Sequence, residues 1–131
     1  MVVWLTGISG AGKTTIAKSI YNFLKPKLKS LVFIDGDVIR DLYGNDLGFS
    51  EECRKIQISR VQKITSFLNK QNLPIIVAAL YANKSILKWN RNNFPNYFEI
   101  YVNTPMSIVE KRDNKQLYKN AKKGNINNVV G

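Results

Sequence analysis

The sequence predicts an α/β fold in which a parallel β-sheet is covered by helices on both faces. Short apolar runs indicate buried strands at residues 2–5, 31–34, 74–80 and 97–102. Helical patterns separate these runs, and a glycine-rich turn joins the first strand to the first helix. Alternating strands and helices are typical of parallel sheets, where ligands bind beyond the carboxyl ends of the strands.

The glycine-rich turn fits a phosphate-binding pattern. Residues 7–14 match G-x-x-x-x-G-K-[ST], between the first strand and a helix expected over residues 15–24. In a P-loop, backbone N–H groups and a helix N-terminus bind phosphates, Lys13 contacts the β- and γ-phosphates, and Thr14 is a ligand for Mg²⁺. The predicted phosphate-binding residues are Gly7, Ser9, Gly10, Ala11, Gly12, Lys13, Thr14 and Thr15. The alternative is a glycine turn that merely joins strand and helix.

The second strand ends in two acids, within the stretch "FIDGD". At this edge of the sheet, Asp35 can position an attacking hydroxyl and accept its proton, or hold water molecules bound to Mg²⁺. The structural alternative is a turn followed by a helix that begins near Val38, with Asp37 as its N-cap. Both interpretations hold together if Asp35 serves the chemistry and Asp37 caps the helix.

The clearest helical pattern spans residues 51–71. Ser50 is its expected N-cap, and Val61, Ile64 and Leu68 form a stripe of the spacing that a buried helix face requires. A polar, lysine-rich segment at residues 113–128 follows a short helix, and we interpret it as a lid over phosphates. An ordinary surface helix and loop is the alternative for that segment.

Composition restricts the class of protein. The 131 residues predict one domain over 1–131, and 44% hydrophobic residues argue against disorder. Cys53 is the single cysteine, and no apolar run approaches the ~18 residues of a membrane span. The first residues also lack the basic segment of a signal peptide. We therefore expect a cytoplasmic protein without a membrane partner.

The net charge of +11 raises the possibility of a nucleic-acid partner. The basic residues are scattered, however, and no RNA-binding motif is present. We expect no nucleic-acid partner, and attribute the charge to a solvated surface and a few groups that meet phosphates.

Four stretches, in order and spacing, resemble the adenylylsulfate kinases: "GISGAGKTT", "DGDVIR", "NDLGFSEECR" and "RDNKQLYKNAKKG". The resemblance covers nearly the whole chain. It implies a P-loop α/β kinase, usually a homodimer, with a flexible lid, which uses MgATP to phosphorylate the 3′-hydroxyl of adenylyl sulfate. The family continues past the position of Gly131 with a strand and a helix that help to hold the ATP base, so we expect these contacts to be absent from residues 1–131.

The resemblance also implies roles for individual residues. Asp35 and Lys13 would be catalytic, with Asp35 orienting the 3′-hydroxyl and holding Mg²⁺ through water. Arg40 and Arg54 would bind the phosphate–sulfate part of the acceptor, and Phe49 would stack on its base, which suits the chemistry of these side chains. The full predicted acceptor-binding set is Asp37, Arg40, Phe49, Arg54, Gln57, Leu80 and Lys115. The alternatives are surface salt bridges for the two arginines and a core position for the phenylalanine.

The sequence departs from the family mainly on the acceptor side. Val38 and Gln57 stand where the family usually has Asn, "ALYANK" at residues 79–84 replaces an "FISPYR"-like stretch, and Val129 replaces a second Phe that sandwiches adenine. This pattern suggests the same transfer to a different nucleotide. The chain is similar to the cytidine diphosphoramidate kinases of capsule phosphoramidate synthesis, including their "VAALY" stretch, and we favour that acceptor over adenylyl sulfate of sulfate activation.

Other classes fit less well. Residues 69–72 resemble the guanine-reading N-K-x-D motif of GTPases, but the last residue is Asn and the stretch precedes a strand. Shikimate-, gluconate- or nucleoside monophosphate-type kinases would share the fold and the P-loop but not "LGFSEECR". A non-catalytic ATP-binding module would bind ATP without transfer.

Overall fold

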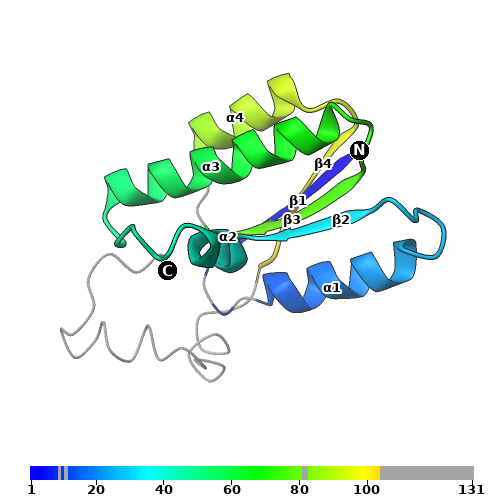
Figure 1. Ribbon diagram of the computed structural model, residues 1–131, viewed down its shortest axis with the longest axis horizontal. Coiled ribbons are helices and arrows are strands. Elements are labelled where there is room, and N and C mark those ends of the chain that lie inside the picture. The colour runs from blue at the N-terminus through cyan, green and yellow to red at the C-terminus, as the bar shows by residue number, and fades with distance from the viewer. Residues whose placement is uncertain (9, 11, 81–82, 104–131) are drawn as a thin grey trace.

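The computed structural model describes residues 1–8, 10, 12–80 and 83–103, and it has the predicted α/β architecture (Figure 1). The elements in chain order are β1 (Val2–Thr6), α1 (Lys13–Leu24), β2 (Val32–Asp35), α2 (Gly36–Leu42), α3 (Glu51–Asn69), β3 (Ile75–Ala79), α4 (Lys84–Asn93) and β4 (Tyr97–Tyr101). All four predicted strands are confirmed, with ends that differ by one residue or match. Among the described residues, no helix is both long and apolar enough to cross a membrane.

The sheet is parallel throughout, with the strand order β2-β3-β1-β4. In the register of the ladders, Thr6 lies opposite both Ala79 and Tyr101, and Asp35 lies opposite Ala78. The carboxyl ends of all four strands therefore reach the same edge of the sheet. The chain turns from one side of β1 to the other between β3 and β4, which is the arrangement that favours ligand binding at this edge.

Helices cover both faces of the sheet, as predicted. In Figure 1, α1 lies below the strands, whereas α3 and α4 lie above them. Alternate residues of β1 point to the two faces of the sheet. Val2 and Trp4 pack in the core between the sheet and the helices α3 and α4, and Val3 and Leu5 pack in the core between the sheet and α1. The central strands β1 and β3 are buried along their whole length, because a parallel sheet between two helical layers has no solvent-facing side.

The long helix α3 begins as predicted. The Ser50 side chain accepts a hydrogen bond from the Cys53 N–H (3.2 Å), so it is the N-cap. Val61 is buried, and Ile64 and Leu68 are partly buried against the same core. The helix ends at Asn69, before the predicted residue 71.

Candidate active site

Three chain segments converge at the carboxyl edge of the sheet. Gly7 and Ile8 follow β1 and lead toward the start of α1, the Asp35–Gly36 step follows β2, and Leu80 follows β3. A Cβ atom on Gly36 would lie 3.5 Å from the Ala78 carbonyl oxygen, so the start of α2 sits close to the end of β3. The sheet thereby brings the P-loop and the acidic turn, which are far apart in the sequence, to one place.

Gly10 and Gly12 of the P-loop have positive φ angles, which a tight phosphate-binding turn uses. Gly12 has φ 99° and Gly10 has φ 81°, in the left-handed region that favours glycine. Gly12 is the N-cap of α1, and being a glycine it has no side chain to cap that helix start. The first N–H groups of α1 and the positive end of its dipole are thus suited to bind an anion. Ser9 and Ala11 of the predicted phosphate-binding set lie outside the described residues.

The ammonium group of Lys13 is held at the loop. Its Nζ donates a hydrogen bond to the Ile8 carbonyl oxygen at 2.7 Å. The lysine is the first residue of α1, so its side chain folds back across the turn that precedes the helix. The cation therefore lies at the predicted phosphate site.

Asp35 links the P-loop to α2 through its two carboxylate oxygens. Oδ2 accepts a hydrogen bond from the Thr14 hydroxyl at 3.2 Å, and Oδ1 accepts one from the Asp37 N–H at 2.9 Å. Asp35 is therefore the N-cap of α2, and the prediction that Asp37 caps a helix beginning near Val38 is wrong. The reason is that β2 runs directly into the helix at Gly36, which leaves Asp35 as the last extended residue. Asp37 instead lies exposed in the first turn of α2, where its negative charge interacts favourably with the positive end of the helix dipole.

Thr14 and Asp35 together present the oxygen ligands that Mg²⁺ prefers. Magnesium is commonly held by one or two protein oxygens, with the remaining positions taken by water and substrate phosphates. Within the described residues there is no group of three or more His, Cys, Asp or Glu side chains that could hold a metal by itself. The hydroxyl and carboxylate fit a magnesium ion that arrives with a nucleotide.

The loop between α2 and α3 brings Arg40 and Phe49 together. The guanidinium carbon of Arg40 lies 5.1 Å from the centre of the Phe49 ring, and Nη1 donates to the carbonyl oxygens of Leu47 and Gly48 at 3.3 Å each. The Phe49 side chain is 45% exposed, so its alternative interpretation as a core aromatic is wrong. An exposed ring beside a guanidinium is suited to stack on a base.

An ion pair between Asp46 of this loop and Arg60 holds the loop against α3, and the sequence did not predict either residue as part of the site. Arg60 donates two hydrogen bonds to the Asp46 carboxylate, at 2.8 and 2.9 Å, and its guanidinium lies 3.9 Å from the Tyr43 ring centre. The hydrogen bonds from Arg60 lower the pKa of Asp46 below its ordinary value. Asp46 and Arg60 are 14 residues apart, so no local pattern joins them.

The face of α3 that meets α2 carries two buried polar residues of the predicted acceptor set. Arg54 and Gln57 are each 8% exposed and lie one helical turn apart. Gln57 Nε2 donates a hydrogen bond to the Gly36 carbonyl oxygen at 2.9 Å, so α3 contacts the residue next to Asp35. The predicted common face is confirmed, and it faces the acidic turn.

The remaining predicted features of the acceptor side are Leu80 and the segment that contains Lys115. Leu80 follows β3 directly and is partly buried. Lys115, the lid expected over residues 113–128 and Val129 lie outside the described residues.

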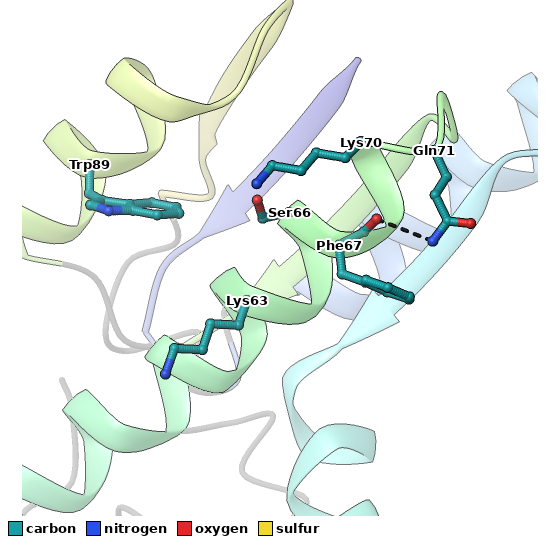
Figure 2. Close-up of a pocket in the computed structure, with 6 residues that line it drawn as sticks. All are labelled: Lys63, Ser66, Phe67, Lys70, Gln71 and Trp89. Carbon is teal, nitrogen blue, oxygen red and sulfur yellow. Dashed lines mark hydrogen bonds between the residues drawn. The ribbon is translucent and has the colours of Figure 1, made fainter.

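A hollow of about 470 Å³ lies away from these residues (Figure 2). Its lining comes from the second half of α3, the turn after it and α4: Lys63, Ser66, Phe67, Lys70, Gln71 and Trp89. It includes none of the predicted site residues. We therefore place the candidate active site at the carboxyl edge of the sheet, around Thr14 and Asp35.

Comparisons with known proteins show what the chain as a whole is similar to. A model of the adenylylsulphate kinase family matches residues 1–131. A cytidine diphosphoramidate kinase of Campylobacter jejuni is 38% identical over 130 residues, which are 99% of this chain and 76% of that protein. An adenylyl-sulfate kinase of Rippkaea orientalis is 36% identical over 131 residues, covering 100% of this chain and 72% of that protein. The structure of the Mycobacterium tuberculosis APS kinase CysC in complex with AMPPNP and APS superposes with a TM-score of 0.83 at 29% identity, over 99% of this chain and 78% of that one.

Proposed function

Since the chain belongs to the adenylylsulfate kinase family, we propose that it transfers the γ-phosphoryl group of ATP to the 3′-hydroxyl of a nucleotide, with cytidine diphosphoramidate as the favoured acceptor. The chain is thus an ATP-dependent phosphotransferase with an alcohol group as acceptor. The hydrogen bond between Thr14 and Asp35 carries the proposal, because it joins the phosphate-binding loop to a carboxylate. Phosphoryl transfer needs these two groups side by side.

The donor side of the proposed mechanism uses the P-loop. The N–H groups at the start of α1 and the ammonium of Lys13 bind the β- and γ-phosphates, for which Lys13 leaves the Ile8 carbonyl oxygen. Thr14 and, through water, Asp35 would hold Mg²⁺ with the nucleotide. When bound there, the metal would neutralise charge on the transferring group.

On the acceptor side, Asp35 orients the 3′-hydroxyl in line with the γ-phosphate and accepts its proton as the new P–O bond forms. The bond between the γ-phosphorus and the β–γ bridging oxygen breaks in the same step, and ADP is the leaving group. Phe49 offers its exposed ring to the base, while Arg40 and Arg54 bind the oxyanions of the acceptor with bidentate hydrogen bonds. We propose a homodimer as the assembly.

Two observations support the choice of acceptor. The relatives include both a cytidine diphosphoramidate kinase at 38% identity and an adenylyl-sulfate kinase at 36%. Val38 and Gln57 stand where adenylylsulfate kinases usually have Asn. Val38 lies on α2 and Gln57 on α3, the helix that contacts the start of α2. Adenylyl sulfate is the second candidate, because the second of these relatives is nearly as similar.

The experiment that tests this choice compares kcat/KM for cytidine diphosphoramidate and adenylyl sulfate, with ADP formation followed in the presence of Mg²⁺. We expect the cytidine compound to be preferred by at least about tenfold, the ratio that one well-made polar contact supports. A reaction without acceptor measures background ATP hydrolysis. A preference for adenylyl sulfate would overturn the proposed acceptor and assign the chain to sulfate activation.

A further inference from the structure

The side-chain amide of Gln57 is held in one orientation. Its Nε2 donates to the Gly36 carbonyl oxygen at 2.9 Å. If the amide were turned over, Oε1 would face that carbonyl, and two acceptors would meet without a hydrogen between them. The position of the amide nitrogen therefore determines the position of the amide oxygen.

That oxygen lacks a hydrogen-bond donor in the part of the chain that the structure describes. Gln57 Oε1 is buried, and the residue as a whole is 8% exposed. Buried polar atoms are nearly always paired, because an unpaired one loses water without a replacement. Another buried glutamine of the same helix, Gln62, shows the usual situation. Its Nε2 donates to Asn90 Oδ1 at 2.9 Å, and the Gln62 oxygen is not buried without a partner.

The surroundings of this oxygen indicate which ligand group would pair with it. Gln57 contacts the residue that follows Asp35, and Arg54 lies one turn earlier on the same buried face of α3. A guanidinium binds anionic oxygens, whereas the glutamine oxygen requires an N–H or O–H donor. A terminal phosphoramidate supplies both, since its oxygens are anionic and its nitrogen carries hydrogen. A sulfate at neutral pH supplies acceptors only.

We propose that Gln57 is a specificity-determining residue, whose Oε1 accepts a hydrogen bond from the N–H of a terminal phosphoramidate on the acceptor nucleotide. This inference rests on the proposed function, which brings the distal group of the acceptor to Arg54 and Gln57. Selection arises because a sulfate, or a terminal phosphate in its fully ionised form, would set an oxygen against an oxygen in the same place. The buried amide oxygen then rejects the wrong group as well as binding the right one.

The test uses acceptors that differ at the terminal group. Cytidine diphosphoramidate and cytidine diphosphate share base, sugar and first phosphate, and differ in a terminal nitrogen or oxygen. We expect the wild-type protein to favour the amidate in kcat/KM, and Gln57→Leu to reduce this preference about tenfold, as loss of one hydrogen bond to a buried group would do. An equal loss with both acceptors would show that Gln57 only supports the Asp35 turn, and would overturn the proposal.

Gln62→Leu is the matched control, because it makes the same change at a buried glutamine on α3 that contacts α4 instead of α2. It is expected to leave the ratio between the two acceptors unchanged. If Gln57→Leu does not fold, the wild-type protein decides: no preference for the amidate over the diphosphate overturns the proposal.

A second pair separates this inference from the choice of base. Adenosine diphosphoramidate and adenylyl sulfate compare an amidate with a sulfate on adenine, and their affinities are measured by calorimetry so that the result does not depend on turnover. Amidate preference on adenine, lost in Gln57→Leu, supports the inference even if cytidine acceptors prove poor. Tighter binding of adenylyl sulfate than of the adenosine amidate contradicts it, whichever base is preferred.

Discussion

Lys13→Met is expected to lower kcat by about 10²- to 10³-fold, because the transferring phosphoryl group loses its closest cation. The methionine chain has a similar length, so the start of α1 keeps its packing. The ammonium now bonds the Ile8 carbonyl oxygen at 2.7 Å in a partly buried position, and we expect the loss of this one hydrogen bond to lower the free energy of unfolding by only about 1 kcal/mol.

The measurement is kcat with saturating ATP and acceptor, together with urea unfolding of both proteins. Lys18→Met is the matched control, since Lys18 lies exposed on the same helix. It should retain wild-type kcat. A Lys13→Met protein within a few-fold of wild-type activity would contradict the assignment of this loop to phosphate binding.

Asp35→Asn is expected to lower kcat by about 10²- to 10⁴-fold, the contribution of a general base. The amide oxygen of Asn can still accept the hydrogen bond from the Asp37 N–H, so α2 keeps its cap. The substitution removes the negative charge beside Thr14. In the proposed mechanism this charge accepts the proton of the 3′-hydroxyl and would hold the water bound to Mg²⁺. The variant should therefore be folded and nearly inactive.

Asp35→Ala separates the two roles of this carboxylate. It removes the cap as well as the charge, and is expected to cost about 1 kcal/mol of unfolding free energy beyond Asp35→Asn. Asp41→Asn, an exposed acid of the same helix, controls for the change of net charge and should leave kcat unaltered. Equal kcat for Asp35→Asn and the wild-type protein would mean that Asp35 is a cap without a catalytic role.

The strands and the P-loop were predictable because their signals are local. Each strand is a run of apolar residues, and the loop pattern of residues 7–14 lies between a strand and a helix. The start of α2 was not predictable in the same way. Asp35 and Asp37 are both residues that favour the N-cap position. Which of them caps α2 depends on how far β2 pairs with β3, and this pairing ends at Asp35 and Ala78.

The contacts that shape the acceptor side depend on the fold as a whole. Asp46 and Arg60 are 14 residues apart, and Gly36 and Gln57 are 21 apart, so each pair meets only after α3 packs against α2. The sequence identified Gln57 as a departure from the family pattern. It did not indicate that the Gln57 amide nitrogen bonds the acidic turn while the amide oxygen is buried without a described donor.

Phosphoryl transfer from ATP to a nucleotide 3′-hydroxyl is tested by following the γ-phosphorus itself. The protein is incubated with γ-labelled ATP, Mg²⁺ and either cytidine diphosphoramidate or its 3′-deoxy analogue. We expect label to enter the acceptor that has the 3′-hydroxyl, and none to enter the 3′-deoxy analogue. Label found only in inorganic phosphate with both compounds, and with adenylyl sulfate as well, would contradict the claim.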